Sequence, residues 1–280
     1  MRCLTSLARA FAVALVLAAT AVSAQEQWGG YYGGFGRRVP PRFPTERSFD
    51  GGFHFCRLMY NSDRREDGGS GWTTDYPDAD INFAIRLGEL TKTQITRQPN
   101  GSPDYIVVRP TDPFLFNCPY LHAEDVGTMS LSEGEVKGLR DYFDKGGFMW
   151  VDDFWGPYAW DQWAEQIGRV LPPGEFPIRD LLPDHPIYKS QFAVTELPQI
   201  PSISHWRRFG GSTSERGEFS AEVHWRGISD KHGRLMVVMT HNTDISDAWE
   251  REGEDPRFFF SFSPNGYAVG IDTVLYGMTH

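Results

Sequence analysis

The sequence lacks the short motifs that mark several common kinds of catalytic and nucleotide-binding site. It contains no Gly-x-Ser-x-Gly elbow, no Gly-x-x-x-x-Gly-Lys phosphate loop and no His-Glu-x-x-His pair. These absences argue against a serine hydrolase of the α/β-hydrolase kind, a P-loop nucleotidase and a zinc protease. Since no motif identifies a reaction, function has to be sought in where polar residues fall along the predicted fold.

Cysteine is scarce, because the 280 residues contain only Cys3, Cys56 and Cys118. Cys56 lies inside a predicted strand and Cys118 precedes a proline, so neither occupies a strand-to-helix elbow, and cysteine catalysis is not expected. Cys56 and Cys118 are candidates for a disulfide, which would persist if the protein is exported to an oxidising compartment. The alternative is two unpaired thiols that act as small buried hydrophobes. The spacing does not choose between the two.

Positive charge is in deficit. The chain has 27 Lys and Arg against 37 Asp and Glu, which gives a formal net charge of −10. Cleavage of the amino-terminal segment described next would remove Arg2 and Arg9 and change this charge to −12. A negative protein is repelled by phosphate backbones and anionic lipid headgroups. We therefore expect no nucleic-acid partner.

Long apolar runs are absent beyond the amino terminus. There, Arg2 and Arg9 precede an apolar run over residues 11–19, and small residues follow up to Ala24. This pattern predicts a secretory signal peptide over residues 1–24 and export to the bacterial periplasm or the extracellular space. An uncleaved membrane anchor is the alternative. No later run reaches the roughly 18 apolar residues that a spanning helix needs, so we expect no stable membrane span after cleavage.

The rest of the chain divides into a tether and one domain. Residues 25–48 are rich in Gly and Pro without an apolar period and are expected to form a disordered tether. The length and aromatic content of residues 49–280 suit a single α/β domain. Within it, residues 171–233 are proline-rich and then mixed, which predicts an insertion or a subsidiary sheet.

Apolar runs alternate with helical patterns along the domain. Strands are predicted near residues 53–60, 94–97, 105–108, 148–151 and 235–239, and helices near residues 78–90, 132–145, 160–170 and 264–278. A capping box of Ser132 and Glu135 predicts where the second of these helices begins. Continuous apolar runs mark strands that are buried on both faces. The expected fold class is therefore α/β, with a mostly parallel sheet covered by helices on both faces and a mixed insertion of strands and loops.

Polar residues follow several of these strands, and parallel strands bring their carboxyl ends to one edge, where ligands bind in open α/β sheets. The candidates to bind a ligand are Arg57, Asn61, Trp72, Asp152, Asp153, Trp155, His185, His241, Asn242 and Asp244. Asp152, Asp153 and His241 could hold a divalent metal ion, the one cofactor that these residue types suggest. Asp153 and His241 could instead act as a general acid/base pair.

The polar candidates also have structural interpretations. Asp152 or Asp153 could cap a turn or pair with the predicted buried Arg57. His241 and Asn242 could simply end the strand ladder through bonds from side chain to backbone. No ligand spacing decides between these interpretations and a functional site.

The other candidates lie in loops. Trp72 and Trp155 are in Gly-rich loops, where an aromatic ring could offer a platform for a sugar or a peptide. His185 lies between prolines and could act as a base or as a rigid loop anchor. These loops extend the candidate site beyond the strand ends.

Several segments resemble the bacterial domain-of-unknown-function family 4159. The segments that carry the resemblance are FCRLMY at 55–60, GWTTDYP at 71–77, LRDYF at 139–143 with GGF at 146–148, DDFWG at 152–156, DHPI at 184–187, and GRL at 233–235 with HNTD at 241–244. The resemblance extends over residues 53–280. It brings no assigned activity with it.

What the resemblance implies is a fold similar to class I glutamine amidotransferases, a doubly wound sheet of the flavodoxin-like kind. In true glutaminases an elbow cysteine follows the strand that corresponds to residues 148–151. Here Asp152 and Asp153 take that position, so amidotransferase activity is not expected. Longer relatives are associated with envelope systems that contain an AAA-type ATPase and von Willebrand-type domains, which implies an envelope protein as a partner.

Three functions stay open at this point. The leading hypothesis is an exported protein that binds a small molecule or interacts with an envelope protein. The second is a hydrolase, with or without a metal ion, that acts on sugars or peptides, with Asp153 as base and His241 as acid or metal ligand. The third is a purely structural module, in which the strand-end residues only hold loops together.

Overall fold

The computed structural model describes residues 39–280. The predicted signal peptide over residues 1–24 and residues 25–38 of the predicted tether lie outside the described residues. Within the described part, none of the helices combines the length and the apolar character needed to cross a membrane.

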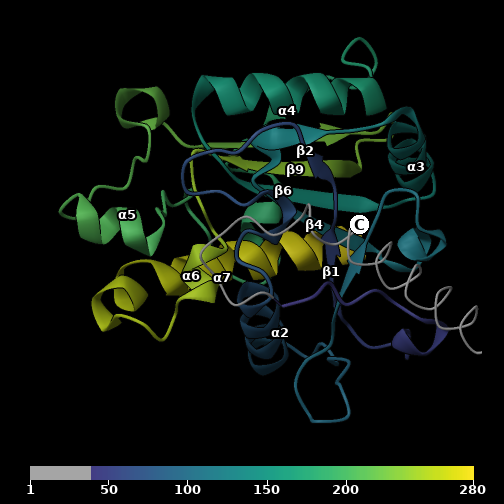
Figure 1. Ribbon diagram of the computed structural model, residues 1–280, viewed down its shortest axis with the longest axis horizontal. Coiled ribbons are helices and arrows are strands. Elements are labelled where there is room, and N and C mark those ends of the chain that lie inside the picture. The colour runs from purple at the N-terminus through teal and green to yellow at the C-terminus, as the bar shows by residue number, and fades with distance from the viewer. Residues whose placement is uncertain (1–38) are drawn as a thin grey trace, which may run out of the picture. The chain divides into compact units, whose positions relative to one another are not determined.

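A seven-stranded sheet organises the described residues, in the order β3-β1-β4-β6-β9-β8-β7 (Figure 1). The five parallel strands are β3 (Tyr105–Val108), β1 (Phe55–Leu58), β4 (Tyr120–Glu124), β6 (Phe148–Phe154) and β9 (Leu235–His241). β8 (His224–Ser229) and β7 (Arg179–Asp180) continue the sheet antiparallel beyond β9. The mostly parallel α/β sheet expected from the sequence is confirmed. A separate two-stranded sheet pairs β2 (Asn61–Ser62) with β5 (Met129–Ser130).

Helices cover both faces of the large sheet (Figure 1). One face carries α3 (Glu133–Asp144) and α4 (Gly156–Val170), and the other carries α2 (Asp78–Leu90), α6 (Asp247–Glu250) and α7 (Pro256–Thr279). α5 (Ile203–Arg208) belongs to the long connection between β7 and β8. Short 3-10 helices occupy Glu46–Ser48, Gly71–Thr73, Pro113–Asn117, Val126–Thr128, Pro186–Lys189 and Gly217–Ser220.

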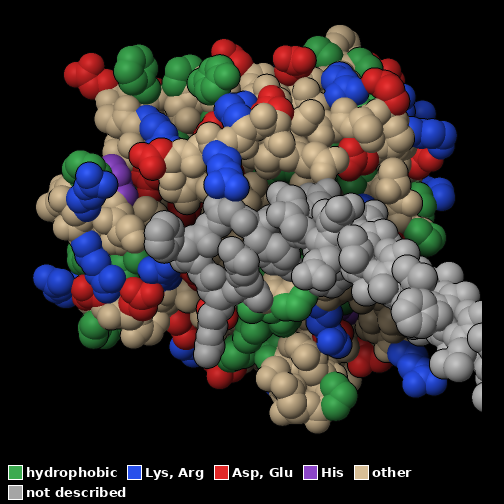
Figure 2. All heavy atoms as spheres, in the orientation of Figure 1, with side chains coloured by type: hydrophobic (Ala, Val, Ile, Leu, Met, Phe, Trp, Pro, Cys, Tyr) green, Lys and Arg blue, Asp and Glu red, His purple; other side chains and the backbone are tan. Residues whose placement is uncertain are grey.

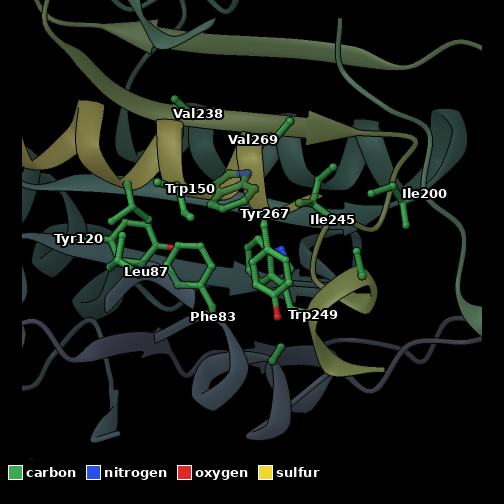
Figure 3. Close-up of a cluster of buried hydrophobic side chains, with 14 of the residues drawn as sticks. Phe83, Leu87, Tyr120, Trp150, Ile200, Val238, Ile245, Trp249, Tyr267 and Val269 are labelled. Atoms are coloured by element: carbon green, nitrogen blue, oxygen red, sulfur yellow. The ribbon is translucent and has the colours of Figure 1, made fainter. Parts of the chain in front are cut away.

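Aromatic side chains fill the layer between the sheet and helices α2, α6 and α7 (Figure 3). Trp249 of α6 lies between Phe83 of α2 and Trp150 of β6, with ring centroids 4.6 Å and 5.6 Å away. Each large aromatic side chain removes about 150–250 Å² from water, so this cluster contributes much of the hydrophobic stabilisation. Trp150 also donates to Thr240 Oγ1 at 2.8 Å, which satisfies its indole N–H inside the core.

Two helix starts show how local signals and packing compete. α3 begins at the predicted capping box, in which Ser132 Oγ accepts from the Glu135 amide and the Glu135 carboxylate accepts from the Ser132 amide. α7 begins earlier than predicted, at Pro256 after the N-cap Asp255. Pro264, where the predicted helix starts, lies inside α7. Buried residues on both sides of it hold the helix together.

The sequence prediction missed β4, which lies between β1 and β6. Its residues His122 and Glu124 interrupt the apolar pattern expected of a buried strand, yet both are fully buried. They are tolerated because they bond to each other and to neighbouring side chains. The predicted strand near residues 94–97 is reduced to isolated bridges from Ile95 to Phe53 and from Arg97 to Pro103.

Two further segments differ from expectation. Residues 39–48 of the predicted tether are ordered against β3, where Val107 N–H donates to the Arg42 carbonyl and Arg42 pairs with Asp104 at 2.7 Å. This segment covers the edge of the sheet, which would otherwise expose unpaired backbone groups. In the insertion over residues 171–233, β7 and β8 join the main sheet rather than forming a subsidiary one.

Cys56 of β1 and Cys118, which precedes β4, form a disulfide with a Cα–Cα distance of 6.1 Å. Both residues are buried. The bond connects positions 62 residues apart. It therefore ties the first strand to the segment that enters its neighbour in the sheet.

Candidate functional site

The carboxyl ends of β1, β4, β6 and β9 meet at one edge of the sheet because these strands are parallel. Residues 39–280 contain four non-glycine residues with positive φ, and all lie at this edge or in the loop that follows β1. They are Asp75 (61°), Asp125 (49°), Asp153 (51°) and Asn242 (64°). Asp and Asn adopt this conformation more readily than most residues, but it still costs energy and is concentrated at functional sites. The edge is therefore the first place to seek a site.

A bulge in β6 separates the environments of the two adjacent aspartates. The ladder with β9 is regular as far as Val151 and resumes at Phe154. Asp152 is fully buried and accepts hydrogen bonds from Thr240 Oγ1 and from the Ser246 amide. Asp153 keeps 9% exposure and accepts from Trp155 Nε1 at 2.8 Å. Asp152 therefore holds the loop after β9, whereas Asp153 bonds the ring of Trp155, two residues further along the chain.

Asp153 is one of five carboxylates that we call the acidic edge, made of Asp75, Asp153, Asp244, Asp247 and Glu250. Oxygens of Asp75, Asp247 and Glu250 all lie within 4.8 Å of one another. Burial, followed by the negative charges of Asp153, Asp75 and Asp247, raises the pKa of Asp244 well above its ordinary value. Burial and the charge of Glu250 do the same to the pKa of Asp75. These groups therefore repel one another strongly when ionised.

The protein supplies little positive charge to the acidic edge. Within residues 39–280, no salt bridge reaches Asp75, Asp153, Asp244 or Asp247, although Arg251 pairs with Glu250 at 2.8 Å. Asp247 and Asp244 instead accept from the backbone amides of Ile203 and Asp247, at 2.7 Å and 2.8 Å. Oδ2 of Asp75 is buried without a hydrogen-bond partner. Because buried carboxylates are normally paired, this arrangement suits a positively charged ligand.

Away from the acidic edge, exposed acidic and basic side chains are mixed. On the face shown in Figure 2, the visible Asp and Glu side chains are interspersed with Lys and Arg. The acidic edge differs because its carboxylates are largely buried and close together.

Arg57, a sequence-predicted ligand-binding candidate, belongs instead to a closed network in the interior. It is fully buried and binds Asp80 through Nε (3.0 Å) and Nη2, and the Thr74 carbonyl through Nη1 (2.8 Å). Its Nη2 also lies 3.9 Å from Glu124 Oε1. Burial opposes its charge, but Asp80 and Glu124 outweigh burial and raise the pKa of Arg57. Arg57 therefore neutralises buried carboxylates and is not available to a ligand.

Glu124, at the end of β4, continues this network towards β9. It bonds His122 Nε2, and the same nitrogen lies 3.1 Å from Ser246 Oγ. His122 Nδ1 bonds Tyr120 Oη at 2.8 Å. In a catalytic triad the acid and the nucleophile bond different nitrogens of the histidine ring, and the substrate can reach the nucleophile. Neither condition is met here, since Glu124 and Ser246 share one nitrogen and are fully buried.

His241 does not join the aspartates. Its ring packs against Phe154 and Trp160, with centroids 4.8 Å and 5.1 Å away, and its Nε2 lies 3.2 Å from the Gly156 carbonyl. Burial lowers the pKa of His241 to about 4, so the ring is neutral at neutral pH. In residues 39–280, no hydrogen bond or ion pair connects it to Asp153, and the two aspartates and His241 do not form a group that could share one metal ion. The structure thus brings together neither the predicted metal trio nor the predicted acid/base pair.

Asn242 serves as a connector between loops. Its backbone N–H donates to the Phe154 carbonyl at 3.0 Å. In its side chain, Oδ1 accepts from the Gly156 backbone N–H at 2.7 Å and Nδ2 donates to the Glu222 carbonyl at 2.6 Å. These bonds fix the start of α4. Asn61 lies in the small sheet, paired with Ser130 and exposed.

Comparison with known families adds to this geometry. The model of DUF4159, a domain of unknown function, matches residues 54–278. The chain belongs to the DUF4159 family. A search of curated proteins finds no match.

The two aromatic candidates of this DUF4159 domain differ in their surroundings. Trp155 borders a pocket of about 460 Å³ that is also lined by Tyr158, Phe219 and Arg216. Trp72 is buried, with its ring centroid 5.4 Å from that of Tyr76. Because Trp155 also donates to Asp153, its pocket adjoins the acidic edge.

His185 lies at the opposite edge of the DUF4159 domain's sheet. It precedes the 3-10 helix Pro186–Lys189, and its Nδ1 accepts from the Ile187 amide at 3.2 Å. It borders a pocket of about 610 Å³ that includes Gly233 and Leu235, where β9 begins. It is therefore not part of the acidic edge.

Sequence reasoning missed four acidic residues at or behind this edge, namely Asp75, Glu124, Asp125 and Glu250. Glu124 ends β4, the strand that was not predicted, and Asp125 follows it. Glu250 lies at the end of a four-residue helix that carries no periodic signal. Asp75 did have a signal, since it precedes Tyr76-Pro77, and a residue pair ending in proline marks a turn.

Asp125 gives a pH-dependent prediction. Burial raises its pKa to about 7, although its carboxylate accepts from the Gly71 amide at 2.7 Å. A carboxyl whose pKa is higher in the folded state contributes stability at low pH, and this contribution is lost as pH rises from about 4 to about 7. Asp125→Asn keeps an acceptor and tolerates positive φ. We expect it to raise the free energy of unfolding by about 1–3 kcal/mol at pH 8 and to change little at pH 4.

Urea unfolding of wild type and Asp125→Asn at pH 4, 6 and 8 checks this prediction. A difference between the two proteins that is the same at all three pH values would show that the Asp125 charge is not the cause.

Proposed function

We propose that this DUF4159 protein is an exported, non-catalytic binding protein whose acidic edge takes up a positively charged ligand. The observation that carries the proposal is the absence of salt bridges to Asp75, Asp153, Asp244 and Asp247 among the described residues, although these carboxylates are largely or partly buried together. Ionised carboxylates in such surroundings are stable only when something compensates their charge. A cationic ligand would supply that compensation.

The strand order supports the location of this site. Numbered along the chain, the five parallel strands follow the order 2-1-3-4-5, which is that of doubly wound, flavodoxin-like sheets. The order reverses between β1 and β4, and ligands of such sheets bind outside the carboxyl ends at that point. Glu124 ends β4 there, and Asp125 follows it. This order also favours the amidotransferase-like fold that the family resemblance implies.

Catalysis is the weaker interpretation. Both cysteines of the described residues form the disulfide, and Asp152 and Asp153 stand where a glutaminase would place its nucleophile. The hydrolase hypothesis paired Asp153 with His241, but His241 is neutral at neutral pH and packs beneath Trp160. A binding role needs neither a nucleophile nor that pair.

Export forms part of the proposal. The disulfide supports it, because such bonds persist in oxidising compartments. The predicted signal peptide over residues 1–24 agrees with this location. A ligand met there could be a free ion, a small organic cation or a basic group of an envelope protein, and the experiment below separates these sources.

The test compares wild type with Asp153→Asn in thermal unfolding, after chelation and then with Ca²⁺, Mn²⁺, spermidine, glucosamine or tetralysine. Asparagine keeps the acceptor for Trp155 and tolerates positive φ. Binding to the folded state at 100 times Kd stabilises by about 2.7 kcal/mol. We expect at least one probe to raise the wild-type midpoint by about 5–10 °C and to have little effect on Asp153→Asn.

Without any probe, Asp153→Asn should be as stable as wild type or more stable, because it removes a repelled charge. The exposed Asp161→Asn on α4 is the matched control and should respond to the probe as wild type does. A response to tetralysine alone would indicate a basic protein partner. If no probe acts and Asp153→Asn is less stable than wild type, the edge is structural and the proposal is wrong.

A further inference from the structure

Three carboxylates of the acidic edge are spaced for a single ion. We propose that Asp75, Asp247 and Glu250 bind one divalent cation of the hard, oxygen-preferring kind, namely Ca²⁺, Mg²⁺ or Mn²⁺. This inference rests on the proposed function and names the class of ligand for that site. Asp75 and Glu250 were not site candidates in the sequence analysis.

The spacing fits metal coordination. Oxygens of the three carboxylates all lie within 4.8 Å of one another. Calcium binds oxygen at about 2.3–2.6 Å and magnesium at about 2.0–2.1 Å, so two oxygens on one ion lie at most about 5 Å apart for calcium and about 4 Å apart for magnesium. One ion can therefore contact all three carboxylates, with water completing its coordination sphere.

Secondary structure holds the three side chains in place. Asp247 begins α6 and Glu250 ends it, while Asp75 lies in the loop before α2. Asn82 of α2 donates to the Trp249 carbonyl at 2.8 Å, which fastens α6 to α2. Two of the ligands therefore come from α6, and the third comes from the loop that leads into α2, the helix to which α6 is fastened.

Each carboxylate keeps an oxygen for an ion. Oδ2 of Asp247 accepts from the Ile203 amide at 2.7 Å, which leaves Oδ1. Oε2 of Glu250 accepts from Arg251 Nε at 2.8 Å, which leaves Oε1. These bonds also restrict the two side chains and so reduce the entropy lost on binding.

Two carboxylate oxygens without a hydrogen-bond partner point to a ligand, and this observation is independent of the clustering of negative charge. Oδ2 of Asp75 is buried and accepts no hydrogen bond. Glu124, which ends β4 at the same edge of the sheet, is 0% exposed, and its Oε2 also lacks a partner. Buried acceptors are nearly always satisfied in folded proteins, so these two oxygens call for a donor or a cation.

The chemistry of the donors selects the ion. All three are carboxylates, and no histidine or free thiol of the described residues joins them. Carboxylate and water ligands suit calcium, magnesium and manganese, whereas zinc and copper favour imidazole and thiolate. The proposed ion is therefore calcium, magnesium or manganese rather than zinc or copper.

Titration with Mn²⁺ tests the inference. The full chain is stripped with chelator, and free Mn²⁺ is followed by its electron paramagnetic resonance signal, with Ca²⁺ and Mg²⁺ as competitors. We expect one Mn²⁺ per chain. Asp75→Asn and Glu250→Gln should each raise Kd at least about tenfold, since even the loss of outer-shell partners costs 10–100-fold.

The substitutions are chosen to preserve the fold. Asparagine tolerates the positive φ of Asp75, and glutamine keeps an acceptor for Arg251. Asp161→Asn is the control and should bind Mn²⁺ as wild type does. Thermal midpoints confirm folding, and if Asp75→Asn does not fold, Glu250→Gln decides.

The outcomes separate this inference from the proposed function. The metal site is wrong if wild type binds none of Mn²⁺, Ca²⁺ and Mg²⁺. It is also wrong if Asp75→Asn and Glu250→Gln fold and bind these ions as wild type does. If spermidine, glucosamine or tetralysine then still stabilises wild type in a manner that depends on Asp153, the proposed function survives with a different ligand. If neither metal nor organic cation binds, both are wrong.

Discussion

Replacing Arg57 with methionine is expected to lower the free energy of unfolding by about 3–5 kcal/mol, or to prevent folding at 37 °C. The guanidinium is fully buried and neutralises Asp80 and Glu124. Methionine fills much of the volume but leaves both carboxylates in the interior without their cation. Chemical denaturation followed by tryptophan fluorescence measures the loss.

Two variants make this prediction specific. Arg57→Lys keeps the charge but not the paired bonds to Asp80, so it should lose less than Arg57→Met. Arg86→Met is the surface control, since Arg86 forms ion pairs with Glu89 and Glu252 while partly exposed. We expect a loss of about 1 kcal/mol or less there. Equal losses in Arg57→Met and Arg86→Met would show that the buried network contributes no more than surface pairs.

Removing the disulfide should lower the free energy of unfolding by about as much as Arg57→Met does. The bond between Cys56 and Cys118 connects positions 62 residues apart, and a loop of that length stabilises by about 4 kcal/mol on chain-entropy grounds. Replacing both cysteines with alanine is therefore expected to lower the thermal midpoint by about 8–16 °C.

Reduction provides the control for the disulfide. A thiol reductant should lower the midpoint of wild type towards that of the double variant and should leave the variant unchanged. If wild type and the double variant have the same midpoint without reductant, the two cysteines are not bonded in solution.

Much of the fold followed from local patterns. Helix α2 was predicted close to its observed bounds, and α3 was predicted from the capping box of Ser132 and Glu135. The apolar runs of β3, β6 and β9 were recognised because strands covered on both faces carry few polar residues. These elements are determined by residues close together in sequence.

The errors have one physical origin, which is that tertiary contacts outweighed local signals. β4 contains His122 and Glu124, whose burial is acceptable only because Arg57, Tyr120 and Ser246 surround them. α7 continues through Pro264 because buried residues on either side anchor it. Neither set of partners can be read from the strand or helix alone.

The site was predicted in part for the same reason. Following the strand ends led to Asp152, Asp153 and Asp244, because parallel strands bring their carboxyl ends together. The bulge that separates Asp152 from Asp153 has no sequence signal, and neither does the packing of His241 beneath α4. Asp75 meets Asp247 and Glu250 of α6 only through the contact of α2 with α6.

Hydrogen exchange gives the most direct test of the acidic edge as a ligand site. Wild type is measured alone and with each probe cation, and amide protection is compared along the chain. We predict slower exchange in residues 70–76 and 242–250, with no change in residues 184–189 at the opposite edge. If no cation slows exchange in either of the first two segments, the acidic edge does not bind a cationic ligand.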